Sequence, residues 1–308
     1  MTEITATMKQ YKRIIVPLGL MDLDRGAISW ASRIAGLAGT EHVLFIHALN
    51  APDFPDETMA KYPWLLAPLD ETIRQKMEDL VHANWTQKPA TEISFEVAKG
   101  KSDTIAILEA VLLDDSDLII VGRGAFGGGM GVKLARKAPC SVMCVTPHPV
   151  GRLERILVPT DFSELSRNAL DVATAFAASE GLTRIDSVHV FNIGTVHHKV
   201  ALPEEEQILL AGEFAEELHR DFLRGSDLRG VTVESHLVID RSVPIAACRL
   251  ARELDVDLIV TSCRGKNAVS SWLLGSNAES LLEQAPVPVF AAKVKGTGRN
   301  LLESLLHG

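Results

Sequence analysis

The stretches RIIVPLG (residues 13–19) and RILVPTD (155–161) are near copies of each other, set 142 residues apart. Three further pairs of similar stretches follow in the same order. They are FIHAL (45–49) with SVHVF (187–191), DLIIVG (117–122) with DLIVTS (257–262), and APCSVMCV (138–145) with APVPVFAA (285–292). Four matches in one order indicate a tandem duplication. The seam lies near residues 148–154, so we expect one domain over residues 1–149 and a second over 150–308, the latter including a C-terminal tail.

Each half alternates short β-rich runs with longer stretches of helical periodicity. The opening run RIIVPL is continuously apolar, which is typical of a parallel strand buried on both faces. The next stretch places Ile28, Ala31 and Ile34 at helical spacing. Strands that alternate with helices predict a parallel sheet with right-handed crossovers. We therefore expect an α/β protein of two tandem doubly wound domains, each with a five-stranded, mainly parallel sheet flanked by helices.

The composition favours a reduced cytoplasmic protein. The chain has 308 residues, 46% of them hydrophobic, and a formal net charge of −9, which argues against a dedicated nucleic-acid or anionic-membrane surface. No apolar run approaches the length of a membrane span, and the N-terminal stretch has no apolar signal-peptide core. The four cysteines include no CxxC pair, so no disulfide framework is expected.

Two loops of the second half follow predicted strands, where open α/β sheets bind ligands. In VPTDFSEL (158–165), Asp161 follows the strand and Ser163 is a plausible N-cap. Asp161 is either part of that cap or an acceptor for a nucleoside hydroxyl or amine.

The second loop is TSCRGKNAVSSWLLGS (261–276). Gly265 can adopt a positive φ, and Arg264 and Lys266 add positive charge. Ser276 begins a helix whose N-terminal N–H groups favour anions, and with Glu279 it matches a capping box. The loop is either a phosphate cradle or an exposed turn before a capped helix.

These residues resemble the universal stress protein family, through VPTDFSELSRNAL, the SVHVF strand, and G-x9-G-S followed by AESLL and APVPV. The resemblance covers nearly the whole chain as two modules, as in the family's tandem members, and implies a Rossmann-like fold of the adenine nucleotide alpha hydrolase type. The family's nucleotide-binding branch has G-x2-G-x9-G-[ST] and binds ATP. Its second and third glycines fall on Gly265 and Gly275 and its hydroxyl on Ser276, whereas Ser262 replaces the first glycine.

The resemblance also implies the remaining site residues. Adenosine would be lined by residues from two strand ends, and Asn277 would lie beside the phosphates. The full candidate set is Pro159, Thr160, Asp161, Val190, Ser262, Arg264, Gly265, Lys266, Gly275, Ser276 and Asn277.

The first half departs from this pattern. Gly19 stands at the position of Asp161, and Gly129 stands where the hydroxyl would align. The loop VGRGAFGGGMG (121–131) is about seven residues shorter than its counterpart. Its glycines are either an anion nest or a tight turn, and we favour the turn and a degenerate site.

Other candidate residues receive a structural interpretation. His47 and His189 occupy equivalent strand positions in the two halves and are expected to be structural. The pair His197–His198 has no Cys or carboxylate nearby at the spacing of metal ligands. No catalytic residue or metal ligand is assigned. Cys263, in the second loop, is the thiol we would test for reactivity.

We therefore expect a universal stress protein that binds ATP, with or without Mg²⁺, in its C-terminal module and acts in stress response or signalling. Turnover is expected to be slow hydrolysis at most. The alternatives are a scaffold of the same fold that binds protein partners and no nucleotide, and an enzyme using Cys263 or Asp161. In the family that the chain resembles, the apolar last strands commonly pair across a dimer interface, so the resemblance implies an internal pseudo-dimer or a homodimer. We expect no nucleic-acid or membrane partner.

Overall fold

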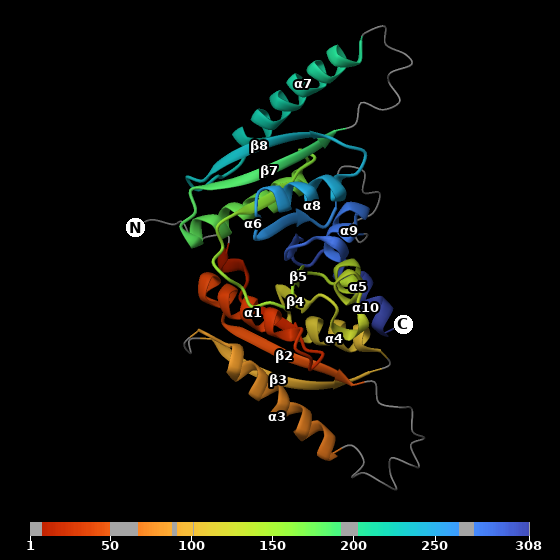
Figure 1. Cartoon of the computed structure of the whole chain (residues 1–308). Helices are drawn as coiled ribbons and strands as arrows, with labels where there is room; N and C mark the ends of the chain where they lie inside the picture. The colour runs from red at the N-terminus through yellow and green to blue at the C-terminus, as the bar shows by residue number, and fades with distance from the viewer. Residues whose placement is uncertain are drawn as a thin grey trace. The chain divides into compact units, whose positions relative to one another are not determined.

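The computed structural model of the chain describes residues 8–49, 67–87, 91–100, 102–191, 203–264 and 274–307. They form two compact units. The first unit comprises Met8–Gly151 with the segment from Lys293 onward, and the second comprises Arg152–Ala292. Each unit has its own parallel sheet and its own core (Figure 1).

The first unit is a sheet covered by helices on both faces. Its described residues form the strands β1 (Arg13–Pro17), β2 (His42–Leu49), β3 (Glu92–Lys99), β4 (Leu118–Gly122) and β5 (Ser141–Val145). They are parallel and lie in the order β3-β2-β1-β4-β5. The helical elements are η1 (Met8–Gln10), α1 (Asp24–Ala38), α3 (Ala67–Asn84), α4 (Asp103–Asp114), η3 (Ala125–Gly127), α5 (Met130–Lys137) and α10 (Arg299–His307). Helices α1 and α3 pack together on the sheet, and α4 packs with α5.

The second unit repeats this arrangement. Its strands are β6 (Ile156–Pro159), β7 (Arg184–Phe191), β8 (Thr232–Ile239), β9 (Leu258–Ser262) and β10 (Val289–Ala292). They are parallel in the order β8-β7-β6-β9-β10. The helices are α6 (Glu164–Glu180), α7 (Glu204–Arg224), α8 (Val243–Glu253) and α9 (Ser276–Gln284). The predicted α/β fold class is confirmed.

The central strands explain why the sequence shows continuous apolar runs. Every residue of β4, β5, β6 and β10 is buried, because helices cover both faces of each sheet. In the first unit Phe45 is fully buried between Phe95, stacked at 5.7 Å between ring centroids, and Trp85, edge-on at 6.0 Å. Such aromatic pairs stabilise a core beyond what the burial of area alone supplies.

The two units share their unusual backbone conformations. Leu20 and Phe162, 142 residues apart, have φ of 59° and 61° directly after the first strand of their units. Asp115 and Asp255, 140 residues apart, both have φ of 52°. Bulky residues rarely adopt this left-handed conformation, so its recurrence shows that the same turn geometry is required in both units.

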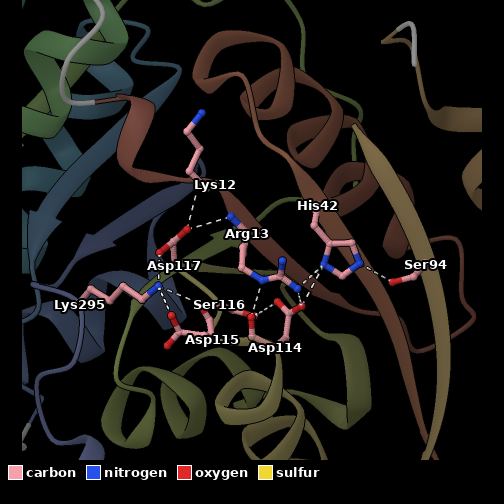
Figure 2. A network of polar contacts seen from close by, with 9 residues as sticks. All are labelled: Lys12, Arg13, His42, Ser94, Asp114, Asp115, Ser116, Asp117 and Lys295. Carbon is pink, nitrogen blue, oxygen red and sulfur yellow. Dashed lines mark hydrogen bonds and ion pairs between the residues drawn. The ribbon is translucent and has the colours of Figure 1, made fainter. Parts of the chain in front are cut away.

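The C-terminal tail does not belong to the second unit, although the predicted second domain, residues 150–308, included it. It packs in the first unit, where Gly296 N donates to Pro139 O at 2.8 Å and Leu302 is 2% exposed. Lys295 Nζ lies 2.8 Å from Asp115 Oδ2 and 2.7 Å from Asp117 Oδ1 (Figure 2). The tail packs here because its basic residue Lys295 pairs with the acidic residues at and after the end of α4, Asp115 and Asp117.

Candidate functional site

The turn from β6 to α6 is organised by Asp161. Its Oδ1 accepts hydrogen bonds from Ser163 N at 3.1 Å and from the hydroxyls of Ser163 and Ser166, each at 2.5 Å. Ser163 is the N-cap of α6 and accepts from Ser166 N at 3.2 Å. One carboxylate oxygen of Asp161 is thus part of the capped turn, as the capping interpretation required. A contact from Asp161 to a nucleoside stays a prediction.

An aromatic stack supports the same turn. His189 on β7 holds its Nδ1 2.8 Å from Thr160 O, and the ring of Phe162 stacks on His189 at 4.2 Å between centroids. The left-handed backbone conformation of Phe162 costs about 1–2 kcal/mol, and the favourable stacking energy offsets part of this cost. In the first unit His47 Nδ1 lies 2.8 Å from Leu18 O. Both histidines therefore have the structural role expected of them.

The start of α9 differs from the prediction. Its N-cap is Gly275, which has an extended backbone (φ −71°, ψ 142°) and whose N–H donates to Cys263 O at 2.8 Å. Ser276 is the first helical residue and not the N-cap, so the predicted capping box with Glu279 is wrong by one position. The N-cap Gly275 makes no side-chain capping hydrogen bond, and the start of α9 carries the positive end of the helix dipole.

The described candidate residues lie at the carboxyl edge of the second sheet. β6 pairs with both β7 and β9, so the residues that follow β6 lie between the ends of β7 and β9. Val190 is near the end of β7, and Ser262 ends β9, where its hydroxyl donates to Arg264 O at 2.5 Å. The bond from Gly275 to Cys263 joins the start of α9, with Ser276 and Asn277, to β9. Gly265 and Lys266 lie outside the described residues.

At the corresponding edge of the first unit, a buried aspartate and a close backbone contact hold the turn after β1. Asp24 is completely buried, and its carboxylate accepts from Gly19 N at 3.2 Å and Met21 N at 2.9 Å. Burial, against these backbone hydrogen bonds, raises the pKa of Asp24. A Cβ on Gly122 would lie 2.9 Å from Leu23 O, so the loop after β4 presses on the turn after β1.

The glycine run in that loop forms a tight turn. Gly128 N donates to Ala125 O at 3.2 Å, and the run from Gly127 to Gly129 has positive φ throughout. The turn interpretation is therefore the one that the geometry favours.

Cys263 is 3% exposed, and its thiol donates to Ala291 O at 3.6 Å. All four cysteines are buried. A buried thiol is a poor nucleophile, so the geometry gives no support to an enzyme based on Cys263.

One polar groove was not foreseen from the sequence. It has a volume of about 200 Å³ and is lined by Glu216, His219, Arg220, Ser235 and Leu237. His219 Nε2 lies 2.9 Å from the hydroxyl of the buried Ser187, and burial, with a smaller effect of His189, lowers the pKa of His219. The one sequence signal is that His219 falls on the core-facing side of α7.

Comparison with known proteins identifies the second unit. Residues 152–293 match the model of the Universal stress protein family. A Staphylococcus haemolyticus protein whose name assigns it to this family is 35% identical over 83 residues, which are 27% of this chain and 50% of that protein. The chain thus spans about half the length of the curated relatives it matches.

Solved structures agree at the level of the fold. A Pseudomonas aeruginosa structure named for the same family covers 98% of this chain and 100% of its own, with a TM-score of 0.61 and 19% identity. A universal stress protein from Archaeoglobus fulgidus covers 92% of this chain and 99% of its own, with a TM-score of 0.58 and 19% identity. Within the part of the chain that the structure describes, no helix is long and apolar enough to cross a membrane.

Proposed function

Because the chain belongs to the universal stress protein family through residues 152–293, we propose that its second unit binds an adenine nucleotide, ATP, and serves in stress response and signalling. The supporting observation is the start of α9. Its N-cap, Gly275, makes no side-chain capping hydrogen bond, and its N–H donates to Cys263 O at the sheet edge where Asp161 also lies. A helix N-terminus of this kind favours phosphate by hydrogen bonding and by its dipole.

The turn after β6 and the start of α9 would bind different parts of the ligand. Val190 and the turn after β6 would take the nucleoside, with Asp161 as the acceptor. Ser276, Asn277 and the described Arg264 would face the phosphates, with Mg²⁺ as an accompanying ion. We assign no general base, so the proposed role is binding and signalling in the cytoplasm and not rapid turnover.

The first test is release of bound nucleotide. The purified protein is denatured, the released small molecules are separated by chromatography, and ATP is titrated calorimetrically into the emptied protein. About one nucleotide per chain supports a single site in the second unit. Two per chain would show that the first unit also binds. No release and no binding heat would favour the alternative, a scaffold of the same fold that acts through protein contacts.

Ser276→Asp localises the site. A carboxylate at the first helical position stabilises the helix N-terminus but repels phosphate, so the fold should persist while ATP affinity falls about tenfold or more. The matched control is Val243→Asp, which adds the same charge at the first position of α8 and should leave affinity unchanged. Undiminished binding by Ser276→Asp would contradict the assignment.

A further inference from the structure

We infer that the second unit holds a divalent-metal site built from Asp186, Glu234 and His236, near the amino ends of β7 and β8. One potential ligand atom from each residue lies within 4.8 Å of the others, and the residues are those of adjacent parallel strands. Asp186 is in register with Glu234, and His236 is two residues further along β8. Alternate residues of a strand share a face, so the three side chains converge on one face of the sheet.

Asp186 supplies an independent indication that a cation belongs here. Its side chain is 1% exposed, and its Oδ1 lies 2.8 Å from His236 Nε2. Its Oδ2 is buried and makes no hydrogen bond, although Arg155 Nε lies 3.4 Å away as an ion pair. The arginine supplies charge without a hydrogen bond, and a coordinated metal ion would give this buried oxygen the directed bond that it lacks.

Two arginines compete for the same carboxylates. Arg155 Nε lies 3.4 Å from Asp186 Oδ2, which is an ion pair without a hydrogen bond. Arg184 Nη1 lies 2.5 Å from Glu234 Oε2, and its Nη2 lies 3.6 Å from Asp186 Oδ1. The side chain of Arg184 is 43% exposed, so it can turn into solvent and give up Glu234 to a metal ion. Metal binding must therefore displace Arg184, and this competition limits its affinity.

The donor set selects the class of metal. Two carboxylate oxygens and one imidazole nitrogen suit a borderline ion such as Zn²⁺, which leaves a further position for water. Coordination through Nε2 requires the neutral tautomer of His236 with its proton on Nδ1. The first unit has Leu44 and Ser94 at the positions of Asp186 and Glu234, so it lacks the set.

Calorimetric titration of ZnCl₂ into the nucleotide-free protein, in a buffer that does not coordinate zinc, tests the site. Loss of groups that only orient metal ligands typically weakens affinity about 10–100-fold, so His236→Gln and Glu234→Gln should weaken zinc binding about tenfold or more. Arg184→Gln should tighten it, because a competing cation is removed. Circular dichroism checks that each variant is folded.

The matched control is His42→Gln. His42 in the first unit also forms an imidazole–carboxylate pair, with Nδ1 2.9 Å from Asp114 Oδ1, but Ser94 and not a second carboxylate lies 2.7 Å from its Nε2 (Figure 2). Zinc affinity should be unchanged in this variant. Absence of saturable binding in both the wild type and Arg184→Gln, or equal affinity in His236→Gln and the wild type, would overturn the proposal. Because no nucleotide is present, either result leaves the ATP proposal untouched.

Discussion

Replacing Asp117 by alanine would remove the carboxylate that joins three segments of the first unit. Asp117 Oδ2 accepts hydrogen bonds from the backbone N–H groups of Lys12 and Arg13, each at 2.8 Å (Figure 2). Its Oδ1 lies 2.7 Å from Lys295 Nζ in the C-terminal tail, and the side chain is 8% exposed. The substitution leaves two backbone donors at the start of β1 without their acceptor.

The expected loss follows from these contacts. A hydrogen bond to a charged group contributes about 1.5–3 kcal/mol, so two contribute about 3–6 kcal/mol, and water that enters the partly buried site offsets some of this. The pair with Lys295, which is 45% exposed, adds about 1 kcal/mol or less. We expect the free energy of unfolding of the first unit to fall by about 4 kcal/mol.

Urea denaturation combined with hydrogen exchange at the amides of Lys12 and Arg13 measures this loss. Asp257→Ala is the matched control, because Asp257 Oδ2 accepts from Glu154 N at 2.8 Å and Arg155 N at 2.9 Å in the second unit. It should destabilise the second unit and leave protection in the first unchanged. A loss under about 1 kcal/mol in Asp117→Ala, against the range for charged hydrogen bonds, would refute the reasoning.

Three further outcomes are expected. Gly131→Ala should cost about 1–3 kcal/mol in urea unfolding, because the new Cβ would lie 1.9 Å from Cys144 Sγ, whereas Gly212→Ala, with no atom within 4 Å, should be neutral or stabilising. A thiol reagent should label none of the four cysteines before denaturation and all four afterwards, and rapid native labelling would contradict their burial. The backbone amides of α10 should lose their protection against hydrogen exchange, after correction for the intrinsic pH dependence of exchange, as the pH falls below 3.8 and as it rises above 10.5. The hydrogen bond from Lys295 lowers the pKa of Asp115, so the stabilisation that Asp115 contributes is lost in acid. Burial lowers the pKa of Lys295, but its hydrogen bonds to the two carboxylates outweigh burial and raise it. The stabilisation that Lys295 contributes is therefore lost in strong base. Protection unchanged across both limits would show that apolar packing alone holds the tail.

The fold could be predicted from the sequence because its signals are local. Continuous apolar runs mark strands buried on both faces, and the repeat along the chain gives the same element order twice. Asp161 could be placed at the carboxyl edge for the same reason, since it directly follows a buried strand.

Other features depend on contacts between residues far apart in sequence. Lys295 meets Asp115 across 180 residues, and no periodicity records that pairing. The convergence of Asp186 and Glu234 depends on which strands pair and in which register. The start of α9 shifted by one residue because the bond from Gly275 to Cys263 fixes the N-cap.

The packing of the tail in the first unit sets an order for biosynthesis. The segment from Lys293 onward completes the first unit, yet a ribosome makes it only after the whole of Arg152–Ala292. Until then the acidic end of α4 lacks its contact with Lys295. The half of the protein that is translated first therefore needs the last residues of the chain to complete its contacts.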